Sequence, residues 1–213
     1  PDHWDDRYAT IGTDQVSWFQ ERPAMSLQLL RALDLPPAAP IVDIGGGAST
    51  LVDFLVDAGH TDITVVDLSA TALAAARSRV ASDAVTWIEA DIRTWQPSRA
   101  FTVWHDRAAF HFLTDPVKQQ HYWSTVHAHV PIGGWVIVGT FAQDGPQACS
   151  GLPVQRWGHD ALIAAMGSGF TVTARERELH VTPSGGEQPF TWVVAQRTRT
   201  TSITPDGDSK EQQ

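Results

Sequence analysis

Three carboxylates stand at or just after the ends of successive apolar runs in the first half of this 213-residue chain. Asp43 stands two residues before the glycines 45–47, Asp67 stands 20 residues after Gly47, and Asp91 follows the third run. Glycines let a backbone approach a ligand without a Cβ clash. A carboxylate at that distance can accept hydrogen bonds from the hydroxyls of a ribose. The spacing therefore predicts a nucleoside-binding site.

Three interpretations of this pattern compete. The first is a tight turn with a structural aspartate. The second is a nicotinamide dinucleotide site, whose fingerprint has Gly or Ala where Thr50 stands and places a pyrophosphate over a helix end. The third is S-adenosylmethionine, which has no phosphate. Asp43 favours the third, because a carboxylate there repels a pyrophosphate but attracts the ammonium group of a methionine tail.

Alternating strand and helix patterns must position these residues. Continuous apolar strands separated by helices indicate a parallel sheet that is covered on both faces. Two late extended runs, joined by a glycine-containing turn, indicate a terminal antiparallel hairpin. We expect strands at 40–44, 62–67, 85–89, 101–105, 135–141, 170–181 and 189–196, and helices at 24–33, 49–58, 70–80 and 115–129.

With these motifs in place, residues 1–197 resemble the class I S-adenosylmethionine-dependent methyltransferases. The acidic-glycine motif of that family matches 43–47, its ribose-binding acid matches Asp67, and its adenine-proximal acid matches Asp91. The resemblance implies a Rossmann-like, seven-stranded, mostly parallel α/β sheet with an antiparallel C-terminal hairpin. It also implies S-adenosylmethionine as the cofactor. The residues we expect around it are Asp43, Gly45, Gly47, Asp67, Leu68, Asp91, Ile92 and His105.

A narrower similarity lies in the lead-in, residues 1–38. The segments 3–8 and 16–20 resemble the lead-in of the branch that contains the lysine methyltransferases of elongation factor 1A and citrate synthase. By that analogy Arg7, Tyr8 and Trp18 contact the methionine part of the cofactor. The alternative is that these aromatic residues only pack a lid helix on the sheet.

Candidate catalytic residues follow the fourth expected strand. Methyl transfer is an in-line displacement, so the enzyme chiefly aligns nucleophile, methyl group and sulfur. A base is needed only where the nucleophile arrives protonated, and histidine titrates near neutrality. We therefore expect His105, Asp106 and His111 at the catalytic centre, although either histidine could instead be structural.

Residues for the methyl acceptor are expected nearby. The lysine-methyltransferase branch has Asp-Lys/Arg-Gly-Thr/Ala-aromatic-Asp here, and this chain keeps Asp106, Arg107 and Phe110 but has His111 in place of the second acid. That departure weakens the case for a lysine acceptor. The loop 141–154 is long and rich in Gly and Pro, as loops that cover binding sites often are. The expected acceptor-binding residues are Arg107, Phe110, Phe141, Cys149 and Arg156.

Composition limits the partners and the compartment. The net charge of −9 disfavours nucleic acid, and no apolar run or leader pattern indicates a membrane span or a signal peptide. Cys149 is the single cysteine, which fits a reducing cytoplasm. A metal site built from His105, His111 and His180 lacks any supporting motif, so we expect none. We expect one domain over 1–198 and a disordered tail over 199–213.

Taken together, these features predict a cytoplasmic S-adenosylmethionine-dependent methyltransferase with a small-molecule acceptor. The first alternative is a protein-lysine methyltransferase, which the lead-in and the Asp-Arg pair at 106–107 suggest. The second is a cofactor-binding module without transfer activity.

Overall fold

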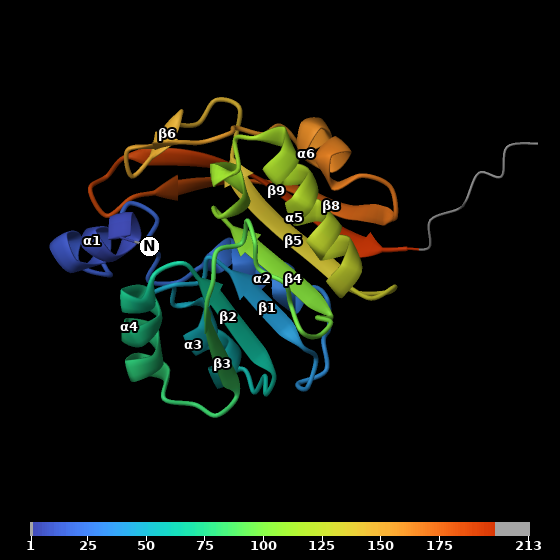
Figure 1. The fold of residues 1–213 in the computed structure, drawn as a ribbon, viewed down its shortest axis with the longest axis horizontal. Helices are drawn as coiled ribbons and strands as arrows, with labels where there is room; N and C mark the ends of the chain where they lie inside the picture. Colours follow the sequence, from blue (N-terminus) through green and yellow to red (C-terminus); the bar gives the residue numbers. More distant parts are fainter. Residues whose placement is uncertain (1, 199–213) are drawn as a thin grey trace, which may run out of the picture.

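The computed structural model describes residues 2–198, so the tail expected at 199–213 lies outside the described residues. Seven strands form one sheet in the order β3-β2-β1-β4-β5-β9-β8 (Figure 1). The first five strands in this order pair in parallel. β9 pairs antiparallel with β5, and β8 pairs antiparallel with β9, which confirms the predicted fold class. The strands are β1 (Ile41–Ile44), β2 (Ile63–Asp67), β3 (Val85–Glu89), β4 (Val103–Arg107), β5 (Trp135–Phe141), β8 (Phe170–Val181) and β9 (Glu187–Arg197).

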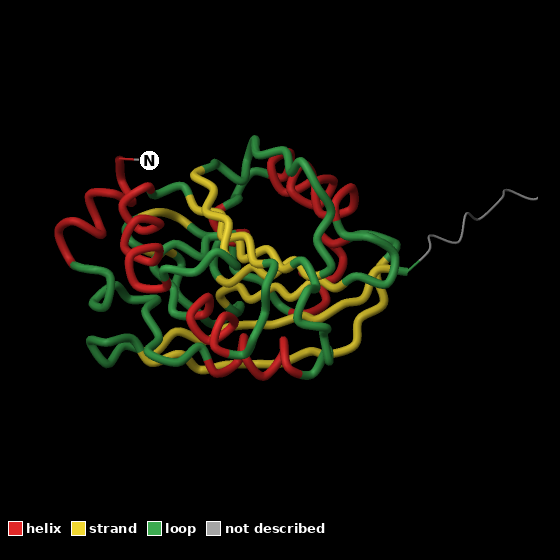
Figure 2. The backbone as a smooth tube through the Cα atoms, turned by 90° about the horizontal axis from the view of Figure 1, so that it is seen from below, coloured by secondary structure: helices red, strands yellow, loops and turns green. Residues whose placement is uncertain are grey.

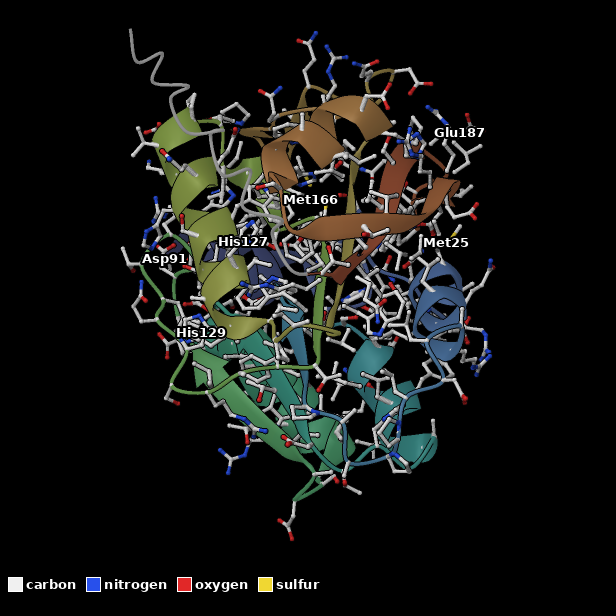
Figure 3. The ribbon with its side chains drawn as sticks, turned by 90° about the vertical axis from the view of Figure 1, so that its right-hand side faces the viewer. Met25, Asp91, His127, His129, Met166 and Glu187 are labelled. Atoms are coloured by element: carbon white, nitrogen blue, oxygen red, sulfur yellow. The ribbon has the colours of Figure 1, made fainter. Side chains whose placement is uncertain are left out.

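Helices cover both faces of this sheet (Figure 2). One face carries α2 (Ala24–Arg31), α3 (Leu51–Asp57) and α4 (Ala70–Val80), whose leucines share one apolar cluster with the sheet. The other face carries α5 (Pro116–His129) and α6 (His159–Met166). Figure 3 shows Met25 of α2 and His127 of α5 on opposite sides of the sheet. Burial on both faces explains why the inner strands β1, β2 and β5 are almost continuously apolar, whereas the edge strand β8 alternates with polar residues.

The side chains of each strand alternate between these two faces. In β1, Ile41 packs toward α2 and α3, while Val42 packs toward α5. In β4, Val103 shares the first face and Trp104 the second. Because the period of a strand is two residues, Asp106 must leave β4 on the side opposite to His105 and Arg107. This alternation decides which expected site residues can meet.

The fourth strand differs from the prediction. It covers Val103–Arg107 instead of 101–105, because it pairs with β1 from Val103 onward and with β5 as far as Arg107. Asp106 and Arg107 are therefore strand residues and do not belong to a loop after the strand. A single 3₁₀ turn, Phe110–Phe112, follows them.

The N-terminal segment and the C-terminal hairpin meet. Nε2 of His180 lies 2.8 Å from the carbonyl oxygen of Ser17, and Gln20 donates to the carboxylate of Glu178 over 2.8 Å. The helix α1 (Asp2–Ile11) lies beside α4 (Figure 1). Among the described residues, no helix has both the length and the apolar character that crossing a membrane requires.

Candidate active site

The main cavity of the described structure has a volume of about 380 Å³ and opens at the carboxyl ends of the four neighbouring strands β1 to β4. Open α/β sheets hold their ligands at this edge. Five residues expected around the cofactor line it: Gly45, Asp67, Leu68, Asp91 and Ile92. Four further expected residues line the same cavity, namely Tyr8, Trp18, Arg107 and Cys149.

Two carboxylates mark one end of the cavity. Asp67 ends β2 and accepts a hydrogen bond from the Ser69 N–H over 2.8 Å. Burial, reinforced by the nearby charge of Asp43, raises the pKa of Asp67 to about 7. Asp91 differs, because Arg93 donates to it and holds its pKa below the usual value. At neutral pH the cavity therefore presents the Asp67 carboxyl group, which is about half protonated, and the Asp91 carboxylate, which is ionised.

The glycine turn between β1 and α3 has no room for side chains. Gly45 and Gly47 have φ values of +67° and +37°, which non-glycine residues rarely adopt. A Cβ on Gly47 would lie 2.6 Å from a carboxylate oxygen of Asp67 and 3.1 Å from the Tyr8 hydroxyl. A Cβ on Gly46 would lie 2.6 Å from a carboxylate oxygen of Asp43. The turn therefore brings backbone, carboxylates and the lead-in into close contact.

Helix α1 covers the cavity like a lid. Its Asp5 carboxylate accepts hydrogen bonds from the Ser69 hydroxyl (2.6 Å) and from the Thr71 N–H (3.1 Å) at the start of α4. Its Tyr8 hydroxyl accepts a bond from the Trp18 ring over 3.2 Å. Trp4 packs edge-on against Trp18 and lines the cavity. The aromatic residues of the lead-in thus both pack the lid and face the cavity.

His105 is held between two polar partners on the α2 face of the sheet. Its Nδ1 lies 2.7 Å from a carboxylate oxygen of Asp43, and its Nε2 lies 2.9 Å from the Ser26 hydroxyl. The ring is buried, and with Asp43 and Ser26 it borders a second, smaller cavity of about 40 Å³. Both ring nitrogens are therefore engaged. The expected role of His105 as a base is not supported by this arrangement, whereas a role in orienting Asp43 is.

Asp106 faces the other side of the sheet. Its carboxylate accepts hydrogen bonds from the backbone N–H groups of Ala109 and Phe110 and from the Tyr122 hydroxyl, which lies 2.7 Å away. It is fully buried, and that burial raises its pKa to about 6. The expectation that Asp106 contacts the reacting groups is therefore corrected. Strand alternation turns it toward α5, where it fixes the turn after β4.

Three more expected residues lie in the core. Phe110 is fully buried against Tyr122 and Trp157, and Phe141 is fully buried against His111. Neither ring can contact a ligand in either cavity, so their expected roles in acceptor binding are corrected. His111 is also fully buried, and burial together with the charge of Arg107 lowers its pKa to about 3. It borders neither cavity, and such a low pKa makes it a weak base.

Of the remaining expected residues, some lie away from both cavities and one lies in a cavity wall. Arg7 and Arg156 line neither cavity, and Arg156 instead donates to the Gly145 carbonyl oxygen over 3.2 Å. Cys149 lies in the short strand β6 (Ala148–Cys149), which pairs with β7 (Leu152–Pro153) inside the loop 141–154. Burial raises the pKa of its thiol to about 11, so it stays protonated at neutral pH.

Several residues at the other end of the cavity were missed in the sequence. Phe112, Leu152 and Pro153 line it there. The family motif pointed to Phe110 as the aromatic residue of this turn. The sequence does not show which aromatic residue of a 3₁₀ turn faces the cavity. Ser26, the partner of His105, lies 79 positions earlier and carries no local signal. In the part of the chain that the structure describes, no three potential metal ligands gather in one place.

Comparisons with known proteins agree with this geometry. A family model described as a methyltransferase domain matches residues 41–134. The trans-aconitate 2-methyltransferase of Azoarcus sp. is 30% identical over 113 residues, which cover 53% of this chain and 42% of that protein. The match thus spans less than half of this curated relative.

Solved structures show the same fold over nearly the whole chain. The 1,6-didemethyltoxoflavin-N1-methyltransferase of Burkholderia thailandensis, solved with 1,6-didemethyltoxoflavin and S-adenosylhomocysteine, superposes with a TM-score of 0.72 at 21% identity. That superposition covers 93% of this chain and 87% of that one. An S-adenosylmethionine-dependent methyltransferase from Anabaena variabilis gives 0.71 at 16% identity, over 92% and 94% of the two chains. The fold is therefore that of the class I methyltransferases.

Proposed function

We propose that this chain, whose residues 41–134 match a methyltransferase domain, transfers a methyl group from S-adenosylmethionine to a small-molecule acceptor. One observation carries the proposal. A single cavity joins an acidic end, suited to a nucleoside, with an end that is lined by aromatic, apolar and guanidinium groups. Gly45 of the glycine turn lines this cavity and also the smaller one beside Asp43.

The residues present fit this cofactor. Asp67 stands where a carboxylate can accept hydrogen bonds from the ribose hydroxyls, and Asp91 with Ile92 offers an acceptor and an apolar face for adenine. Asp43, held by His105, contributes negative charge beside the glycine turn, where the ammonium group of the methionine tail would lie. The polar groups proposed to bind the cofactor are mainly carboxylates, and not amides of the kind that bind phosphate. This favours a sulfonium nucleoside over a dinucleotide.

In this mechanism the chain positions the cofactor and the acceptor and excludes water from the cavity. The bound cofactor supplies an activated methyl group on a sulfonium. Gly45 of the glycine turn, with Asp67 and Asp91 at the acidic end, would hold that cofactor in the cavity. Trp4 and Phe112, whose rings pack edge-on 5.1 Å apart, border the opposite end, where they exclude water and hold the acceptor in line. The engaged nitrogens of His105 and the low pKa of His111 favour an acceptor that needs no base from either of these histidines.

A small acceptor fits better than a lysine side chain. The cavity volume of about 380 Å³ lies within the range of small-ligand sites. A lysine ammonium would have to approach the guanidinium of Arg107, which lines the acceptor end, and like charges repel. The two relatives with named small acceptors, trans-aconitate and 1,6-didemethyltoxoflavin, point the same way. Protein-lysine methylation therefore remains only the second candidate.

The test uses the purified chain, methyl-labelled S-adenosylmethionine and a cell extract that has been separated into protein and small-molecule fractions. We expect label to enter the small-molecule fraction only. Label in a protein band would favour the lysine alternative. Stoichiometric cofactor binding with no label in either fraction would favour a cofactor-binding module. We propose a reducing cytoplasm as the place of action, because Cys149 is the single cysteine of the sequence.

A further inference from the structure

Arg107 has hydrogen-bond donors that the described protein does not use. Its Nη1 donates to the Trp18 carbonyl oxygen over 3.0 Å, and its guanidinium carbon lies 4.8 Å from the centre of the Phe190 ring. Its Nε and Nη2 are buried and have no hydrogen-bond partner. A buried donor without an acceptor is costly, and the cost is greater for a charged group. The unused donors therefore point to a ligand that supplies an acceptor.

The acids near Arg107 are already committed to other donors. The Glu178 carboxylate accepts from Gln20 (2.8 Å) and from the Trp192 ring N–H (2.9 Å). The Asp43 carboxylate is held by His105. Burial lowers the pKa of Arg107, and the nearby acids only partly offset that effect. Even so, a guanidinium stays charged at neutral pH. The charge thus lacks a direct carboxylate partner among the described residues.

The unused atoms form one edge of the guanidinium. In arginine the N–H groups of Nε and Nη2 are parallel, and they match the two oxygens of a carboxylate. Lysine offers no such fork. The edge left free is therefore suited to a planar anion with two oxygens.

Charge is distributed unevenly along the cavity. Its lining acids, Asp67 and Asp91, both lie at the nucleoside end. Its other lining arginine, Arg93, is tied to Asp91. Arg107 projects from the end of β4, in the same cavity as the loop residues Cys149 and Leu152. Arg107 also lines the smaller cavity beside Asp43, so its charge lies where the acceptor end meets the place proposed for the methionine tail.

From this juxtaposition we propose that the methyl acceptor is an organic acid, and that the free Nε–Nη2 edge of Arg107 binds one of its carboxylates. The inference rests on the proposed function and adds the chemical class of the acceptor. Arg107 is a specificity-determining residue in this scheme: it anchors the acceptor and leaves the transfer itself to alignment within the cavity.

The first experiment asks whether the acceptor is an anion. The small-molecule fraction of the extract is passed over an anion exchanger at neutral pH before incubation with the chain and labelled cofactor. We expect the acceptor to be depleted from the flow-through and recovered in the salt eluate. We also expect it to survive treatment with a phosphatase. An acceptor that flows through, or that phosphatase destroys, overturns the proposal.

The second experiment tests Arg107 with the recovered acceptor. R107M should raise the KM for the acceptor by about tenfold or more, because a two-point charge-assisted contact is lost. R107K keeps the charge but loses the fork, so its KM should lie between those of R107M and the wild type. The matched control is R175M, since Arg175 is exposed and pairs with Asp160 on the surface; it should leave KM unchanged.

Binding of adenosylhomocysteine, measured by calorimetry, separates the two proposals. We expect R107M to change this affinity by less than about twofold. An equal loss of cofactor and acceptor affinity would mean that Arg107 binds the cofactor's own carboxylate, and would overturn the inference. Wild-type protein that fails to bind adenosylhomocysteine would refute the proposed function instead. If circular dichroism shows that R107M is unfolded, R107K decides: an unchanged acceptor KM would overturn the proposal.

Discussion

At the scale of single residues, the aspartates near the ends of β2 and β4 have different roles: Asp67 is partly exposed, whereas Asp106 is fully buried. Asp67 faces the main cavity, whereas Asp106 faces the core. Their sequence surroundings, each at the end of an apolar run, are alike. Only the direction in which the side chain leaves the strand separates a candidate ligand-binding carboxylate from a structural one.

Asp67 makes cofactor binding depend on pH. Its pKa is raised to about 7, so the carboxyl group is half protonated at neutrality in the free protein. Ribose hydroxyls donate best to the ionised form, so binding should strengthen as the pH rises through 7. We expect adenosylhomocysteine to bind about tenfold more tightly at pH 8 than at pH 6, by calorimetric titration.

The Asp67→Asn variant should bind weakly and lose this slope. Asp62→Asn is the matched control, because Asp62 pairs with Arg99 just before β2, away from the cavity; it should keep both the affinity and the slope. A slope that persists in the Asp67 variant would assign the titration to another group.

Asp106 should matter for stability. Asp106→Ala leaves two backbone N–H groups and the Tyr122 hydroxyl without their acceptor, and should lower the free energy of unfolding by about 3 kcal/mol or more. Asp115→Ala provides the comparison. Asp115 is an exposed cap that accepts one bond from the Val117 N–H, and its loss should cost only about 1 kcal/mol in urea unfolding. Equal losses would contradict the structural role of Asp106.

At the scale of elements, the sequence predicted the strands and the parallel sheet well, because inner strands such as β1, β2 and β5 are short and mostly apolar, and β8 and β9 are long extended runs joined by a glycine-containing turn. The prediction failed where pairing with a neighbouring strand decides where a strand ends. The β4 strand continues through the charged residues Asp106 and Arg107 because β5 extends far enough to pair with them. Local patterning carries no information on that partner. For the same reason the partners of His105 and Asp106, Ser26 and Tyr122, could not be found from the sequence.

The lid helix α1 should control the escape of the cofactor. Asp5 ties it to the start of α4, so Asp5→Ala should free the lid and speed cofactor dissociation by about two- to fivefold, with little change in melting temperature. Stopped-flow tryptophan fluorescence can follow this step, because Trp4 and Trp18 lie in the lid and its linker. Asp6→Ala, one residue along and exposed, should leave the rate unchanged.

At the scale of the whole molecule, the cavity collects residues from α1, from the carboxyl ends of the four parallel strands β1 to β4 and from the loop after β5. A ligand that bridges these parts binds only the folded protein. Adenosylhomocysteine should therefore raise the melting temperature in proportion to the logarithm of its concentration, with about 2.7 kcal/mol of stabilisation at one hundred times its Kd. Nicotinamide dinucleotide, with its pyrophosphate, should produce no shift in the same scanning fluorimetry. A shift with the dinucleotide alone would refute the cofactor assignment.

The contact between the two ends of the chain has a consequence for biosynthesis. Ser17 and Gln20 form hydrogen bonds with His180 and Glu178, which lie 163 and 158 positions later in the chain. Translation proceeds from the N-terminus, so the lead-in leaves the ribosome long before the hairpin that supports it exists. Until the last two strands have been made, Ser17 and Gln20 lack these partners, and the lid is held only from the α4 side, through Asp5. The protein would thus acquire its closed, ligand-competent pocket as one of the final events of its own synthesis.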